Sequence, residues 1–236
     1  IKYKDQPFIY SALDNYYRSK NDDADFLKTL AIAKELFPND QSFTNEEIDY
    51  YRSAGKMDVL VKKLEDAVAK DPGSYDMNFN LGVTYDNLAN PKDTAGNEAP
   101  MPANYEDLFN KASASYKKAI ALKPDDYGAN FNLGLLYYNR AARIGKKMSA
   151  LGTSKADHAV SDTLSKQQDV YLDDALPYLQ KTFDLLDPKT SLNATELEIY
   201  KSSIQGMQGV YARKNQTDKY NDLKKKMDAA DSKLGK

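Results

Sequence analysis

The sequence predicts an all-α protein built from a repeated helix pair. The pentapeptide Asn-Phe-Asn-Leu-Gly occurs at 78–82 and again at 130–134, and a tyrosine follows each copy three residues later. Tyr17, Tyr51 and Tyr85 are each 34 residues apart, and two prolines share this spacing. Independent landmarks with one spacing indicate that a single structural unit has been copied along the chain. Stacked copies of such a unit act by presenting a surface.

The third and fourth units are longer than the first two. Gly82 and Gly134 are 52 residues apart, which is 18 more than the period. We place the extra residues at 91–108, because this stretch is rich in turn-forming residues. In the fourth unit the extra residues fall at 143–172, which is rich in Lys, Ala, Gln and Asp and is broken at 151–153. We therefore expect lengthened helices that meet at a turn and project as a hairpin.

A single domain over residues 1–236 accounts for these spacings as consecutive helix-pair units. The first helix of a unit carries a small residue that lets its partner approach closely, and a tyrosine one turn later fills the adjacent space. A proline then ends the second helix and sets up the next turn. The predicted units are 7–40, 41–74, 75–126 with its insertion, 127–190 with its helical insertion, and 191–236, which includes a C-terminal capping helix.

Local signals mark individual helices. Two capping-box spacings, each a threonine followed three residues later by a glutamate, predict helix starts at Thr44 and Thr195. Between Val59 and Val68 the apolar residues recur at the 3–4 spacing of an amphipathic second helix. The last segment is more polar, and its three lysines at 224–226 suit a terminal helix whose outer face meets water.

Two stretches resemble the tetratricopeptide (TPR) pattern, which runs Trp-x2-Leu-Gly-x2-Tyr, then Ala-x3-Phe, then Pro. They are Leu81-Gly82-x2-Tyr85 and Leu133-Gly134-x2-Tyr137, and Ala112-x3-Tyr116 followed by Pro124 matches the second half. Asn78 and Asn130 stand where the pattern has tryptophan. The resemblance covers nearly the whole chain and, with its longer third and fourth units, is similar to a bacterial TPR subtype. It implies an α-solenoid of about five repeats, a right-handed superhelix of antiparallel helix pairs.

The composition limits the classes of function. The chain has 236 residues and a net charge of -2, which gives no bias towards nucleic acid. No run of apolar residues is long enough to span a bilayer. The chain has no cysteine and a single histidine, His158, so thiolate metal sites and clusters of histidine ligands are excluded. We therefore expect no metal, no cofactor and no enzymatic activity.

The resemblance places the candidate site on the first helices, which line the concave side of a TPR stack. In TPR proteins the asparagine that corresponds to Asn80 and Asn132 often bonds the main chain of a bound peptide. The positions at which TPR proteins clamp a terminal carboxylate hold Asp76, Gly128 and asparagines, which argues against that ligand class. Apolar side chains on the same face suit an apolar segment or a helix. The candidate groove residues are Asn80, Asn132, Phe79, Phe131, Val83, Asp86, Leu135, Tyr138, Asn139 and Arg52.

We expect a non-catalytic scaffold that binds a peptide or helix of a partner protein in this groove. The alternative is a structural or assembly subunit of a larger complex, for example in the cell envelope, that uses the 143–172 hairpin or the ends of the stack as contacts. Self-association is one form of this alternative. Whether Phe79 and Phe131 face the groove or the core stays open. The compartment is also open, although the start at Ile1 rather than Met and the lack of cysteine favour an exported, periplasmic protein.

Overall fold

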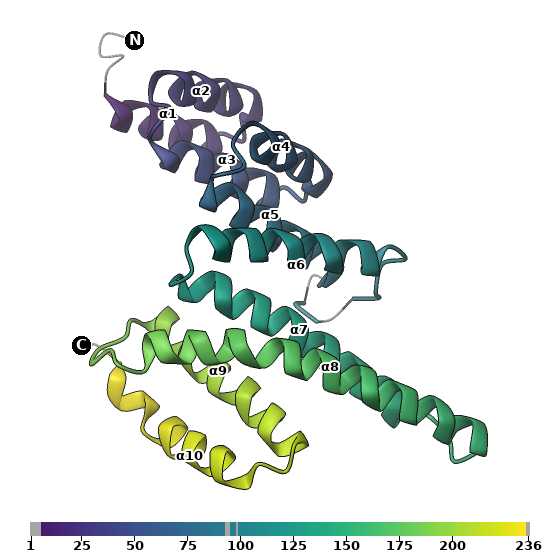
Figure 1. The fold of residues 1–236 in the computed structure, drawn as a ribbon. Coiled ribbons are helices and arrows are strands. Elements are labelled where there is room, and N and C mark those ends of the chain that lie inside the picture. Colours follow the sequence, from purple (N-terminus) through teal and green to yellow (C-terminus); the bar gives the residue numbers. More distant parts are fainter. Residues whose placement is uncertain (1–5, 93–94, 98, 235–236) are drawn as a thin grey trace. The chain divides into compact units, whose positions relative to one another are not determined.

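The computed structural model describes residues 6–92, 95–97 and 99–234 and is built from α-helices (Figure 1). Over these residues there are ten α-helices and one short 3-10 helix, with no strand beyond an isolated bridge. The predicted all-α helical-repeat fold is therefore confirmed. The helices are α1 (Pro7–Ser19), α2 (Asp23–Leu36), α3 (Gln41–Ser53), α4 (Met57–Lys70), α5 (Tyr75–Ala89), α6 (Tyr105–Leu122), α7 (Tyr127–Ser149), α8 (Lys155–Leu186), α9 (Ala194–Arg213), α10 (Thr217–Asp228) and η1 (Ala230–Lys233).

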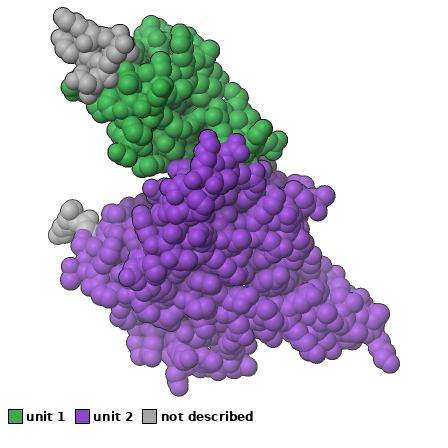
Figure 2. All heavy atoms as spheres, turned by 45° about the horizontal axis from the view of Figure 1, so that its top comes forward, with its two compact units in different colours: residues 1–63 green, residues 64–236 purple. Residues whose placement is uncertain are grey.

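The contacts divide the chain into two compact units, residues 1–63 and residues 64–236, with the boundary inside α4 (Figure 2). In the first unit α1 packs on α2, and α2 packs on α3. In the second unit the pairs are α5 with α6, α7 with α8, and α9 with α10. Successive pairs of this unit meet where α6 contacts α7 and where α8 contacts α9.

The first helices of successive pairs begin at Pro7, Gln41, Tyr75, Tyr127 and Ala194, and the predicted units begin at 7, 41, 75, 127 and 191. The organisation of 1–236 as one domain of five repeats, with insertions at 91–108 and 143–172, stays a prediction. Of these ranges, residues 1–5, 93–94, 98 and 235–236 lie outside the described residues.

Asn78 and Asn130, at the tryptophan position of the TPR pattern, tie the start of α5 and of α7 to the preceding turn. Each side chain is 3% exposed. The Asn78 Nδ2 donates to the Ser74 carbonyl at 2.7 Å and to the Pro72 carbonyl at 3.3 Å. The Asn130 Nδ2 makes the equivalent two bonds in α7, at 2.8 and 3.1 Å. Each buried amide thus supplies a donor to the proline carbonyl of the preceding turn, whereas the Ser74 and Asp126 carbonyls also accept from the Asn78 and Asn130 backbone N–H groups.

The predicted helix starts at Thr44 and Thr195 are wrong. The helix α3 begins after Asp40, whose carboxylate accepts from the Ser42 backbone N–H at 3.0 Å. The helix α9 begins after Asn193, which forms a full capping box with Glu196. Asp and Asn are stronger caps than Thr, and each of these two helices starts at such a residue upstream of the threonine.

The two glycines of the repeated pentapeptides make room for side chains of the paired helices. A Cβ on Gly82 would lie 2.6 Å from the Tyr116 ring of α6. On Gly134 it would lie 2.9 Å from Leu179 side-chain atoms and 3.1 Å from the Leu179 backbone nitrogen of α8. The expected close approach of backbones therefore holds at Gly134, whereas at Gly82 an aromatic ring fills the space.

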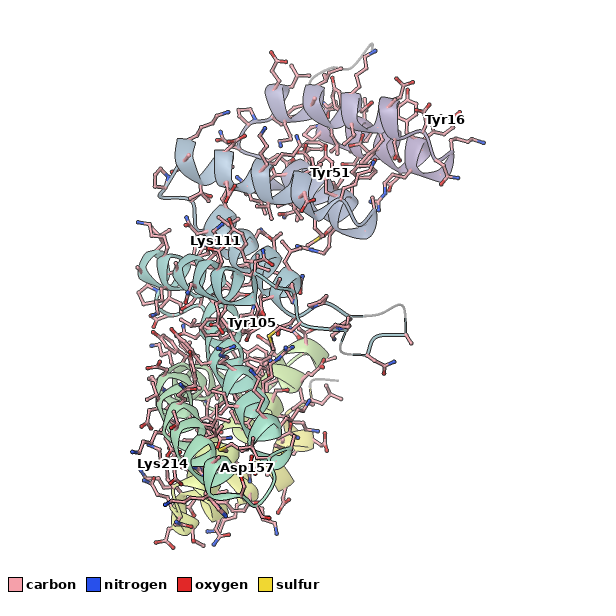
Figure 3. All side chains as sticks on the ribbon, turned by 90° about the vertical axis from the view of Figure 1, so that its right-hand side faces the viewer. Tyr16, Tyr51, Tyr105, Lys111, Asp157 and Lys214 are labelled. Atoms are coloured by element: carbon pink, nitrogen blue, oxygen red, sulfur yellow. The ribbon has the colours of Figure 1, made fainter. Side chains whose placement is uncertain are left out.

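The helices α7 and α8 are 23 and 32 residues long and continue side by side beyond the rest of their unit (Figure 1). They join at 150–154, and Asp157, which closes a capping box with Ser154, lies at the end of this hairpin (Figure 3). The Gln168 Nε2 donates to the Ala141 carbonyl at 3.0 Å and links the two helices along their length.

Candidate functional site

The predicted groove residues of the second unit lie on one face of α5 and one face of α7. On α7 this face contains Asn132, Leu135 and Asn139, which are spaced three and four residues apart and so share a helix side. On α5 it contains Asn80, Val83 and neighbours at the same spacing. Asn139 is exposed, and the half-buried members are Phe79, Asn80, Val83, Asp86, Phe131, Asn132, Leu135 and Tyr138.

The Asn80 side chain is held by its own helix. Its Nδ2 donates to the Asp76 carbonyl at 2.9 Å, and the Thr84 hydroxyl donates to the Asn80 carbonyl at 2.7 Å. An asparagine amide has two N–H donors and an acceptor oxygen, so this bond fixes the rotamer and uses one donor.

Asn132 lies close to a hydrogen bond that links α5 and α6. Its side chain is beside the Tyr116 hydroxyl, which donates to Asp86 Oδ2 at 3.5 Å. The other Asp86 oxygen accepts from Asn90 Nδ2 at 2.6 Å. Burial raises the pKa of Asp86 to about 6, against the opposing effects of the Asn90 and Tyr116 hydrogen bonds and the Arg143 charge. The predicted groove residues Asn132 and Asp86 thus both lie beside the hydroxyl of a tyrosine of the second helix.

The aromatic candidates differ in their surroundings. Phe79 stacks on Tyr75, with ring centroids 5.7 Å apart, and packs on Tyr116 at 6.1 Å. Phe79 therefore contacts rings of α5 and α6 while it stays half-buried. Tyr138 packs against α9, where a Cβ on Gly209 would lie 2.3 Å from its hydroxyl oxygen.

Arg52 lies on α3, in the first unit. Its Nη1 donates to Asp49 Oδ1 at 2.9 Å, one turn away on the same helix. It remains a candidate of that unit alone.

The face of α7 continues past Asn139 into residues that sequence reasoning missed. A hollow of about 150 Å³ lies between the end of α5 and the second half of α7. Three of the missed residues lie on α7 and follow Asn139 at helical spacing, which is the signal that would have identified them. The lining consists of Asn90, Pro91, Lys92, Asn139, Ala142, Arg143 and Lys146.

The remaining features of the described residues are candidate metal ligands, the single histidine and apolar helices. No group of three or more His, Asp or Glu side chains there could hold a metal ion. His158 is exposed on α8. Within the same residues, no helix is long and apolar enough to cross a membrane.

Comparison with known proteins supports the repeat assignment. The family described as TPR repeat matches residues 109–140, which run from α6 into α7. Among solved structures the chain is similar to the MamA protein, with a TM-score of 0.54, 17% identity and coverage of 99% of this chain and 94% of that chain. At this identity the likeness shows the fold alone.

Two further solved structures are less similar. PilW, described as a widely conserved type IV pilus biogenesis factor, gives a TM-score of 0.38 at 18% identity over 89% of this chain and 91% of that chain. Human IFIT1, as a dimer with PPP-AAAA, gives 0.39 at 12% identity over 94% of this chain and 54% of that chain. No curated protein matches the chain in sequence at a significant level.

The matched repeat and the succession of packed helix pairs define the kind of fold. Residues 109–140 match the tetratricopeptide repeat, and the chain has an all-α helical-repeat fold of the TPR type. Proteins with this fold generally act as scaffolds for protein–protein interaction, through the extended surface that stacked repeats create.

Proposed function

We propose that this chain is a non-catalytic scaffold that binds a peptide or helix of a partner protein in the groove face of α5 and α7. The supporting observation is the half-buried face itself, where amides and apolar side chains alternate at helical spacing on both first helices. Such a face can bond a peptide main chain through Asn80 while Val83 and Leu135 contact its side chains.

The main test substitutes the two amides together, as Asn80→Ala and Asn132→Ala. We expect the folded double variant to lose most partner capture from the native cell, measured by affinity purification and quantitative mass spectrometry. The matched control is Asn110→Ala, an exposed asparagine on α6. The groove assignment is wrong if the double variant captures as much partner as the wild type while its circular dichroism and melting temperature are native.

A photo-crosslinker separates the groove from the rest of the surface. A benzophenone amino acid at Leu135 should attach to the captured partner, whereas the same group at Lys118, exposed on α6, should not. Equal labelling from both positions contradicts the proposal, because a groove ligand contacts one face only.

One observation favours the alternative of an assembly subunit. The α7–α8 hairpin exposes apolar side chains, with Val160 47% and Val170 58% exposed. Exposed apolar residues on a projecting element suit a contact with another chain. Substitution of either valine by glutamate should then reduce self-association in sedimentation velocity while peptide binding in the groove persists. An unchanged sedimentation coefficient argues against this role.

A further inference from the structure

The second half of α7 is basic. No aspartate or glutamate occurs between 127 and 156, whereas Arg140, Arg143, Lys146 and Lys147 lie in this stretch. Arg140 pairs with Glu106 on α6, and its guanidinium lies 4.8 Å from the centroid of the Tyr105 ring. The charge of Arg140 is therefore largely offset within the protein.

Arg143 is placed differently from Arg140. It lines the hollow at the end of the groove face, together with Lys92 and Lys146. Its guanidinium carbon lies 5.5 Å from the centroid of the Tyr105 ring, which restricts its orientation. The amide-bearing side chains of Asn90 and Asn139 complete the polar lining, and the described lining residues include no carboxylate.

Asp86 is an acidic group whose charge interacts with Arg143, and its carboxylate is also engaged by neighbouring side chains. The Asp86 carboxylate accepts from Asn90 at 2.6 Å and from the Tyr116 hydroxyl at 3.5 Å. It is half-buried and does not line the hollow. The lining therefore offers the Arg143 guanidinium and the Asn90 and Asn139 amides to an occupant.

We propose that this hollow binds a carboxylate side chain of an acidic partner segment that lies along the α5–α7 groove face. A guanidinium presents a planar fork of N–H donors that matches a carboxylate in two parallel hydrogen bonds. Lys92 adds charge, and the amides can donate to the remaining lone pairs. This inference rests on the proposed groove function. It adds that the ligand is acidic and that its carboxylate binds at the Arg143 end of the groove face.

A protein segment fits this surface better than a nucleic acid. The same face of α7 continues to Leu135, and that of α5 to Val83, both half-buried apolar side chains. A net charge of -2 gives the chain no general attraction for a phosphate backbone. The hollow is also distinct from Asp76 and Gly128, which occupy the positions where TPR proteins clamp a terminal carboxylate.

The experiment uses defined probes on the full chain. Fluorescein-labelled amphipathic peptides of twelve residues carry Leu at every third or fourth position and either Glu, Gln or Lys elsewhere. Fluorescence anisotropy gives the Kd of each peptide for the wild type, for Arg143→Ala and for Lys147→Ala. Lys147 is the matched control, because it is exposed on α7 and does not line the hollow.

We expect the Glu peptide to bind about tenfold more tightly than the Gln peptide, and Arg143→Ala to remove most of this preference. Lys147→Ala should change the Kd by less than about twofold, since an exposed charge is screened by salt. Arg143→Glu should reverse the order, so that the Lys peptide binds most tightly. Circular dichroism and the melting temperature establish that each variant is folded.

Several results overturn the inference. They are absence of binding by the Glu peptide, equal binding of all three peptides, and equal losses in Arg143→Ala and Lys147→Ala. A fluorescein-labelled oligoadenylate that binds as tightly as the Glu peptide and is weakened by Arg143→Ala would assign the hollow to nucleic acid instead.

The failure of this inference is distinguishable from failure of the groove function. If the Gln peptide binds, and Asn80→Ala with Asn132→Ala abolishes that binding, the groove function stands whatever the charge preference. If no peptide binds and the Leu135 crosslinker labels no partner, both proposals fail.

Discussion

Asp14 on α1 is a carboxyl group that the fold buries without a donor. The residue is 1% exposed, and within the described residues neither oxygen accepts a hydrogen bond from an N–H or hydroxyl group. The Glu46 carboxyl of α3 lies against it, and Arg18 is one turn away. Burial, followed by the charge of Glu46, raises the pKa of Asp14 to about 7, whereas Arg18 opposes the shift. Burial raises the pKa of Glu46 as well.

This pair predicts a pH dependence of stability. A folded pKa above the unfolded value of about 3.9 means that the native state holds the extra proton. The contribution of Asp14 is therefore most favourable below about pH 4 and is lost as pH rises through about 7. Asp14→Asn gives an amide that cannot ionise and can donate to Glu46. The melting temperature of the variant minus that of the wild type should therefore be larger at pH 8 than at pH 5. Thermal unfolding by circular dichroism from pH 5 to 8 measures this effect.

The control for Asp14→Asn is Glu35→Gln, which removes an exposed charge on α2. Glu35→Gln should leave the wild-type pH profile in place. A profile for Asp14→Asn that coincides with the wild type at every pH would show that Asp14 ionises normally in the folded protein.

The hydrogen bonds of the buried Asn78 contribute to the stability of the protein. Asn78→Ala removes two hydrogen bonds and leaves the Pro72 carbonyl without the amide, so it should lower the free energy of unfolding by about 1–3 kcal/mol. Asn80→Ala removes a bond within an already paired helix and should cost less than about 1 kcal/mol. Urea unfolding compares the two variants, and an equal cost for both contradicts the capping role of Asn78.

At the scale of elements, the pairing of α5 with α6 depends on Gly82. An added Cβ would lie 2.6 Å from the Tyr116 ring, which is fixed between neighbouring helices. Overpacking of this kind costs about 1–3 kcal/mol, which exceeds the gain of about 1 kcal/mol in helix propensity. Gly82→Ala should therefore destabilise the protein, in urea unfolding as well as by a lower melting temperature.

Gly145 on α7 provides the matched comparison for Gly82. Its Cβ would meet only the far end of the Gln168 side chain, at 2.8 Å. Moving that amide weakens its hydrogen bond to the Ala141 carbonyl, which about offsets the gain of about 1 kcal/mol in helix propensity, so Gly145→Ala should be nearly neutral. If both substitutions gave the same loss, ring packing would not explain Gly82.

At the scale of the whole molecule, contacts are local along the chain. The helix α2 packs on α1 and α3, whereas α10 packs on α9 and η1. In repeat proteins each unit contacts only its neighbours, so a local loss of stability spreads over a limited distance.

Hydrogen exchange tests this locality. Leu30→Ala in the core of α2 removes a buried side chain and should cost about 2–5 kcal/mol locally. Exchange measured by mass spectrometry should accelerate strongly in α1–α2 and much less in α9–α10. Equal acceleration at both ends of the chain would indicate one cooperative unit over 1–236.

The sequence predicted more of the fold than of the candidate site. The spacing of Tyr and Pro located the helix pairs, because a repeated unit must repeat its packing residues. Helix faces were also predictable, since Asn132, Leu135 and Asn139 share a side by their spacing alone. The start of α9 was missed because Asn193 competes with Thr195 as a cap, and spacing does not rank two nearby caps.

The sequence by itself determined the all-α repeat fold and the face on which α5 and α7 present their amides. Only the tertiary structure decided that Phe79 packs on Tyr75 and Tyr116, that Asn132 lies beside the Tyr116 hydroxyl that donates to Asp86, and that Arg143 lines a hollow beside Asn90. The physical reason is that periodicity follows from a helix's own residues. A contact between two helices depends on the shapes of both surfaces. Between α5 and α6, the missing side chain of Gly82 leaves the space that the Tyr116 ring fills.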